Sequence, residues 1–169
     1  MRPVESRGFT LIELVVVISV LAILAAVALP RFIDVADAAH ENAVRATGSG
    51  LQTGVVMVRS QWFANGAPGG GVENIQGFGD DTVDVNGNGW PTGVSGNTTS
   101  AGMGTTECLE LWPALFQGSA PTVSTGTDAD YQVTVGTGNN ECVYTYQKDN
   151  TGNSIGYDAD EGIVSVTIN

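Results

Sequence analysis

The first feature of the hydrophobic pattern is an apolar run at residues 9–29, FTLIELVVVISVLAILAAVAL. It contains a single charged side chain, Glu13, close to its front edge. A helix rises about 1.5 Å per residue, so this run spans about 31 Å, close to the roughly 30 Å thickness of the hydrocarbon core of a bilayer. The pattern predicts a membrane-spanning helix that carries an acid.

The acid inside this run needs an explanation. A carboxylate within lipid costs roughly 2.5 to 3.5 kcal/mol at mid-bilayer and less near an end of the span, so Glu13 calls for a partner. In the alternative interpretation, its side chain reaches back to the headgroups and needs none.

Beyond the run, a second pattern predicts that the helix continues. Pro30 removes a backbone N–H and clashes with the carbonyl four residues earlier, which predicts a kink rather than an end. After it, apolar and small positions recur at steps of three and four, typical of one helix face: Ile33, Ala36, His40, Val44, Thr47, Leu51, Val55, Val58 and Trp62. We expect one helix from about residue 9 to about residue 64, with a second half that docks on a globular head.

Two features of this second half could suggest function. Gly48, Gly50 and Gly54 each cost about 1 kcal/mol relative to Ala in a helix interior, so they indicate close packing against a sheet or, as the alternative, a hinge. His40 is the single histidine of the chain. One imidazole without others favours a helix residue at the neck of the molecule over a metal ligand.

The Gly-rich segment that follows predicts loops, with one short strand near residues 82–85. It contains Asp84, Asn86 and Asn88 in the D-x-N-x-N-G spacing of calcium loops. The twelfth position is Ser95 where such a loop wants a bidentate Glu, so the segment is not an EF-hand. A looser calcium loop and a plain Asn-Gly hairpin turn before Trp90 both remain open.

The carboxyl-terminal third predicts a small sheet. ECLELWPALF is a compact apolar run in which Pro113 is expected to allow only a short helical turn on either side. Further on, apolar residues alternate with polar ones near residues 131–135, 142–146 and 164–168, the period of half-buried strands. A fourth short strand at residues 154–157 would form a hairpin with 162–168, which completes an antiparallel meander.

Charge and composition narrow the function. The chain has 169 residues and a net charge of −12, and residues 66–169 hold 13 acids and one base, for 1 − 13 = −12. Such a head should repel nucleic acid backbones, so no nucleic acid partner is expected. With one His and no recognisable nucleophile motif, the sequence offers no catalytic constellation. Acid pairs such as Asp158 and Asp160 lie in Gly/Asn-rich turns, which favours solvated surface over glycosidase chemistry.

The amino-terminal motif carries a family resemblance. RGFTLIELVVVI at residues 7–18, continued by AILAAVALPRF, resembles the signature of type IV prepilins and of the pseudopilins of type II secretion. The resemblance implies that a prepilin peptidase cuts between Gly8 and Phe9 and that the new amine of Phe9 is N-methylated. It also implies that Glu13 pairs with the Phe9 amine of a neighbouring subunit, which would supply the partner that the acid needs.

The same resemblance implies an organisation and a fold. Residues 1–8 would be a leader peptide, 9–29 the membrane and filament-core half-helix, and 30–64 the amphipathic half-helix. Residues 65–169 would be the head, divided into a variable loop at 65–106 and a disulfide-linked antiparallel sheet at 107–169. The expected class is α+β: the type IV pilin fold, a long kinked helix on a small sheet.

Cys108 and Cys142 are the only cysteines, and they form one even pair in a head that should face an oxidising exterior. We expect a disulfide, with two free buried thiols as the alternative. Such a carboxyl-terminal cysteine loop again resembles type IV pilins.

Shorter motifs suggest a subgroup. NGNGWPTG, ECLELWPALF, ECVYTYQ and NSIGYDADEGIV resemble the MSHA (mannose-sensitive haemagglutinin) group of pilins. The expected function is thus a structural subunit of a pilus for adhesion or motility, first held in the inner membrane with a periplasmic head and then extracellular. Its partners would be pilin subunits, the prepilin peptidase and the assembly machinery of the inner membrane. A pseudopilin is the alternative, and that family includes calcium sites in the loop that corresponds to Asp84, Asn86 and Asn88.

Overall fold

The computed structural model describes residues 8–138 and 140–169, so residues 1–7 of the expected leader lie outside it. The described chain divides into two units, with the boundary between Ala39 and His40. Helix α1 (Leu11–Ala64) supplies most of the first unit and continues into the second. The predicted single helix from about residue 9 to about residue 64 is therefore confirmed.

Pro30 lies inside α1, and the helix continues through it without interruption. This agrees with the expectation that the proline does not end the helix. The kink at Pro30 stays a prediction.

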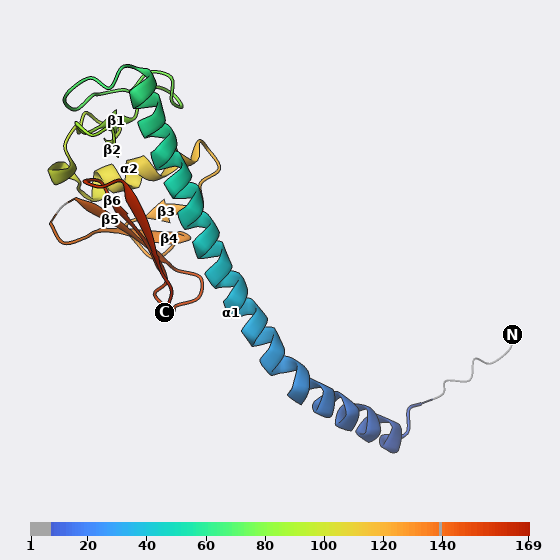
Figure 1. Ribbon diagram of the computed structural model, residues 1–169. Coiled ribbons are helices and arrows are strands. Elements are labelled where there is room, and N and C mark those ends of the chain that lie inside the picture. The colour runs from blue at the N-terminus through green and yellow to red at the C-terminus, as the bar shows by residue number, and fades with distance from the viewer. Residues whose placement is uncertain (1–7, 139) are drawn as a thin grey trace, which may run out of the picture. The chain divides into compact units, whose positions relative to one another are not determined.

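The second unit holds the head, an α+β arrangement. After α1 come β1 (Asp84–Val85), β2 (Pro91–Gly93), a short 3-10 turn (Ser100–Gly102) and α2 (Thr105–Phe116). The last part of the chain forms β3 (Val123–Ser124), β4 (Tyr131–Val135), β5 (Glu141–Tyr146), β6 (Ser154–Asp158) and β7 (Ile163–Thr167). Strands β3 to β7 make one sheet in sequential order, and β1 pairs with β2 in a separate hairpin (Figure 1).

The sheet confirms the predicted meander and corrects one edge. Strands β4 to β7 pair antiparallel, with the expected hairpin closed by a bond from the Gly162 amide to the Asp158 carbonyl. The expectation of a wholly antiparallel sheet is wrong at β3, which pairs parallel with β4. This pairing is local: Asp130 accepts bonds from both the amide and the hydroxyl of Thr122, which closes the loop between the two strands.

Helix α2 corrects the expectation for Pro113. The helix is continuous over its 12 residues and includes this proline. A proline in a helix interior costs about 3 kcal/mol. Here Pro113 is exposed, whereas Leu111, Trp112 and Leu115 are buried, so the packing of the opposite face offsets the cost.

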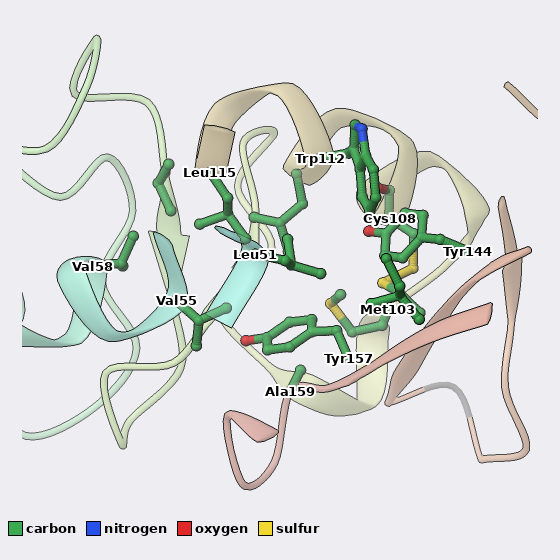
Figure 2. Packing of buried hydrophobic residues seen from close by; sticks show 14 of the residues in the cluster. Leu51, Val55, Val58, Met103, Cys108, Trp112, Leu115, Tyr144, Tyr157 and Ala159 are labelled. Atoms are coloured by element: carbon green, nitrogen blue, oxygen red, sulfur yellow. Dashed lines mark hydrogen bonds between the residues drawn. A yellow bond between two sulfur atoms is a disulfide. The ribbon is translucent and has the colours of Figure 1, made fainter. Parts of the chain in front are cut away.

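The core lies between α1, α2 and the sheet. Leu51, Val55 and Val58 of α1 belong to one buried cluster with Trp112 and Leu115 of α2. Figure 2 shows this cluster together with Tyr144 and Tyr157 of the sheet. The predicted stripe is confirmed from Val44 to Trp62, whereas Ile33 and Ala36, in the first unit, are exposed.

The glycines of α1 confirm the packing interpretation. A Cβ added at Gly48 would collide with Val166 of β7, and one at Gly54 would lie 2.6 Å from the carbonyl oxygen of Leu115. Gly50 instead faces the ring of Phe116. The glycines therefore let α1 approach β7 and α2, and the second of these neighbours is a helix rather than the expected sheet.

One side chain of α1 also meets the outer edge of the sheet. Gln52 accepts a hydrogen bond from the Val164 amide at 2.9 Å and donates one to the Gly162 carbonyl at 3.3 Å. Strand β7 is the last strand of the sheet in the described part of the chain, and this side chain satisfies backbone groups at the start of its outer edge.

Candidate functional site

The candidate cleavage site lies immediately before α1. Gly8 and Phe9 are outside the helix, both are exposed, and the Phe9 side chain is 90% accessible. A Cβ added at Gly8 would meet nothing within 4 Å. The fold itself therefore places no steric limit on residue 8, and any requirement for glycine there would come from the peptidase that binds it.

The first turn of α1 holds Glu13 in a capping box. Thr10 donates from its amide and from its hydroxyl to Glu13 Oε2, each at 2.8 Å, and the Glu13 amide donates to Thr10 Oγ1 at 3.3 Å. These reciprocal bonds satisfy backbone donors that a helix start leaves unpaired. A negative charge at this end is also favoured by the helix dipole. The carboxylate is thus held beside the start of the helix.

Sequence analysis missed the role of Thr10. The signal was available, because T-x-x-E directly before an apolar run is the sequence pattern of a capping box. Both bonds to the carboxylate go to Oε2, and Oε1 has no bond within the described residues. The site can therefore take a second donor without losing the cap. Pairing of Glu13 with a neighbouring Phe9 amine stays a prediction.

The helix that follows this site exposes many large apolar side chains. The described residues contain one helix, α1, that is long and apolar enough to cross a membrane, and its most apolar window is wholly exposed. Large side chains from Phe9 to Val35 have exposed fractions between 45% and 90%. A soluble monomer rarely exposes so large an apolar patch, so this segment indicates contact with a membrane or with other chains.

The disulfide is confirmed in the head. Cys108 of α2 and Cys142 of β5 are bonded, with Cα atoms 5.5 Å apart, and both residues are fully buried. The bond ties α2 to the centre of the sheet.

The residues of the D-x-N-x-N-G motif organise a hairpin. The Asp84 carboxylate is buried and accepts bonds from the Asn74 amide at 2.9 Å and the Gly96 amide at 2.6 Å. Asn86 Oδ1 accepts bonds from the amides of Asn88 and Trp90. These hydrogen bonds hold the turn together without a metal, which supports the hairpin interpretation. Among the described residues, no group of three His, Cys, Asp or Glu side chains could hold a metal.

An arginine of α1 fixes this hairpin to the helix. The Arg59 guanidinium lies 4.0 Å from the centre of the Trp90 ring, and its Nε donates to the Asn88 carbonyl at 3.2 Å. The stacking and the hydrogen bond hold the turn in place. No local sequence pattern predicts this contact, because Arg59 and Trp90 are far apart in the sequence.

The neck residue His40 is not isolated. Its Nδ1 lies 3.0 Å from the hydroxyl of Tyr146 on β5, and the two rings are in contact. This agrees with a place at the neck.

Comparison with known proteins supports the interpretation of the amino terminus. Residues 5–29 match the family model described as the prokaryotic N-terminal methylation motif. The chain is 41% identical over 64 residues to the type IV narrow pilus major component PilA5 of Thermus thermophilus, an alignment that covers 38% of this chain and 53% of that protein. The chain thus spans about half the length of this curated relative. No solved structure matches the chain.

Both findings concern a structural class of protein rather than an enzyme. The family model covers the segment that holds Gly8, Phe9 and Glu13. The chain therefore carries a prokaryotic N-terminal methylation motif and is similar, over part of its length, to a type IV pilus component.

Proposed function

We propose that this chain is the precursor of a type IV pilin subunit. In this proposal a prepilin peptidase cuts between Gly8 and Phe9, the Phe9 amine is methylated, and the processed chain assembles into a pilus through α1. One observation carries the proposal: within a methylation motif, an exposed Gly8–Phe9 bond directly precedes an exposed apolar helix whose first turn holds one carboxylate.

The apolar surface supplies the driving force for assembly. Burying apolar surface stabilises by roughly 25 cal/mol per Å², so an exposed helix such as residues 11–29 gains by packing against copies of itself. When different surfaces meet head to tail and the rotation between neighbours does not close a ring, repetition gives a helical fibre. The acidic heads would coat the outside.

Glu13 would set the register of this packing. A carboxylate that enters an apolar bundle without a partner costs several kcal/mol, whereas one that meets an ammonium satisfies both charges. Processing creates such an ammonium at Phe9, and the carboxylate is already held in place by Thr10. The register in which the two groups meet is therefore favoured over others.

The charges before the apolar run support a topology with the amino terminus in the cytoplasm. Arg2 and Arg7 precede the apolar run, and basic residues near a span favour the cytoplasmic side. The head, with its disulfide, would then face the periplasm of the inner membrane before assembly and the exterior afterwards. The assembly machinery in the inner membrane would extract the processed subunit.

Within the type IV pilins, we propose that this chain belongs to an MSHA-like pilus used for adhesion or motility. This assignment rests on the resemblance of the carboxyl-terminal motifs. A type II pseudopilin is the less favoured alternative, because a shorter head without a disulfide would support it, whereas a disulfide here joins α2 to β5.

The test begins with the processed protein. Mass spectrometry of wild-type protein should find a chain that begins at Phe9 and carries one extra methyl group. Replacement of Gly8 by Leu should leave the leader attached. Recovery of processed protein from the Gly8→Leu variant would contradict the proposed cleavage site.

Assembly is tested separately. Glu13→Gln should leave processing and head stability unchanged and reduce the number of pili seen by electron microscopy. Glu41→Gln is a matched control, because Glu41 is also an acid of α1 and its side chain reaches only Arg45, at 3.9 Å. Normal piliation in the Glu13 variant would refute the pairing. Loss of surface fibres in a deletion strain would favour a pilin, and loss of protein secretion alone would favour a pseudopilin.

A further inference from the structure

Aromatic rings form a continuous path from the head core to the neck. Trp112 contacts Tyr131 with ring centres 5.1 Å apart, Tyr131 contacts Tyr146 at 5.2 Å, and Tyr146 contacts His40 at 5.7 Å. Trp112 and Tyr131 are buried, whereas Tyr146 and His40 are half-buried. The path therefore begins at a tryptophan that solvent does not reach and ends at the surface.

The hydroxyl partners distinguish the last tyrosine from the others. A phenol gives up an electron easily only when its proton can leave to a base at the same time. The Tyr146 hydroxyl has such a base, because His40 Nδ1 lies 3.0 Å away and accepts a proton when the neutral ring carries its hydrogen on Nε2. The hydroxyls of the two most deeply buried tyrosines donate to neutral backbone groups instead: Tyr144 to the Cys108 carbonyl and Tyr157 to the Pro91 carbonyl.

We propose that Trp112, Tyr131 and Tyr146 form a one-electron relay that moves an oxidising equivalent from the head core to Tyr146, whose phenolic proton passes to His40. An external one-electron oxidant first removes an electron from Trp112. An electron then passes from Tyr146 through Tyr131 to Trp112, the O–H bond of Tyr146 breaks, and its proton binds to Nδ1. The products are restored Trp112, a neutral tyrosyl radical and an imidazolium.

The charges around the neck suit these products. Burial raises the pKa of Tyr146, and the nearby carboxylates Asp149 and Asp130 raise it further, so its proton stays in place until oxidation. Burial likewise raises the pKa of Tyr131 to about 12.

The relay would protect the buried cluster around the disulfide from oxidative damage. The ring centres of Trp112 and Tyr144 are 4.3 Å apart, and the Tyr144 hydroxyl donates a hydrogen bond to the backbone carbonyl of Cys108, one of the two disulfide cysteines (Figure 2). A radical that stayed at Trp112 would react inside this cluster. At half-buried Tyr146 a thiol or a similar soluble reductant can return the electron, and His40 can return the proton.

The relay can be tested by starting the oxidation at tryptophan. Laser photoionisation of the tryptophans in the full chain, with the ejected electron scavenged, is followed by the decay of tryptophanyl absorption and the growth of tyrosyl absorption. Spin trapping with mass spectrometry then locates the radical. We expect the tyrosyl radical mainly at residue 146 in the wild-type chain.

Three variants and one matched control decide the outcome. Tyr146→Phe and Trp112→Phe should each lower the tyrosyl yield severalfold, and His40→Gln, which keeps a polar side chain but not a base, should slow its formation. Tyr144→Phe is the control, because Tyr144 contacts Trp112 even more closely but has no base. It should behave as wild type. An unchanged yield in Tyr146→Phe, or an equal loss in Tyr144→Phe, would overturn the relay; unchanged melting temperatures show that each variant is folded.

Discussion

Gly54 of α1 lies against Leu115 of α2 so closely that a Cβ at residue 54 would be 2.6 Å from the Leu115 carbonyl oxygen. A backbone atom cannot move aside as a side chain can. Gly54→Ala should therefore destabilise the head by about 1 to 2 kcal/mol, because overpacking outweighs the roughly 1 kcal/mol gain in helix propensity. Denaturant unfolding of the detergent-solubilised chain measures this.

Gly50 provides the matched comparison. A Cβ there would be 2.9 Å from Cε1 of Phe116, an atom at the end of a partly buried side chain that can rotate. Gly50→Ala should be neutral or should stabilise by up to about 1 kcal/mol. Equal effects at the two positions would show that it does not matter whether the added Cβ meets a backbone atom, as at residue 54, or the end of a side chain, as at residue 50.

The disulfide should dominate the stability of the head. Cys108 and Cys142 are 34 residues apart, and the loop-closure model gives about 3.7 kcal/mol for a bridge of that span. Replacing both by Ala should lower the free energy of unfolding by at least about 2 kcal/mol. Reduction of wild-type protein should produce a similar loss without any substitution. An unchanged denaturation midpoint after both the double substitution and the reduction would contradict this role.

The motif at Asp84 should be structural and independent of calcium. Asp84→Ala leaves the amides of Asn74 and Gly96 without their buried acceptor, which should cost about 1 to 3 kcal/mol for each unsatisfied group. Chelators should leave the melting temperature of wild-type protein unchanged. A rise in that temperature with added calcium, lost in Asp84→Ala, would instead establish a metal site.

Acid should weaken the β3–β4 edge of the sheet. The pKa of Asp130 lies below its ordinary value because Thr122 donates to the carboxylate from its hydroxyl and its amide, and Lys148 adds a nearby positive charge. A lowered folded pKa means that this stabilisation is present above the unfolded pKa, about 3.9, and is lost as the pH falls through the folded value.

The corresponding experiment compares unfolding free energies between neutral and acidic pH. Asp130→Asn should be less stable than wild type at neutral pH, and the difference should shrink in acid. Thr122→Val should reduce the acid dependence in the same direction. Parallel profiles in all three proteins would show that Asp130 contributes nothing to it.

The elements with a clear period were predictable from sequence. The apolar stripe from Val44 to Trp62 and the alternation in β4, β5 and β7 report burial directly, because one face of each element meets the core. Strand β3 was not predictable, since two residues carry no period and their pairing depends on Asp130. Continuity of α2 through Pro113 was also missed, because tertiary packing of Trp112 and Leu115 overrides the local cost.

The candidate site divides in the same way. Gly8, Phe9 and Glu13 lie within one short stretch of sequence, so a local motif is enough to predict them as site residues. The cap from Thr10 could have been read as well. The contact between Arg59 and Trp90 and the pair formed by His40 and Tyr146 arise only when distant segments meet, so no window of sequence contains them.

Gln52 has a consequence for how such subunits can join. An open sheet margin is a template on which another chain can add a strand, and that route leads to amyloid-like growth. By binding the Val164 amide and the Gly162 carbonyl, Gln52 takes the place of part of a missing strand and discourages β-augmentation there. Addition of a strand at this margin is thereby disfavoured, which is compatible with the proposed assembly through the apolar helix.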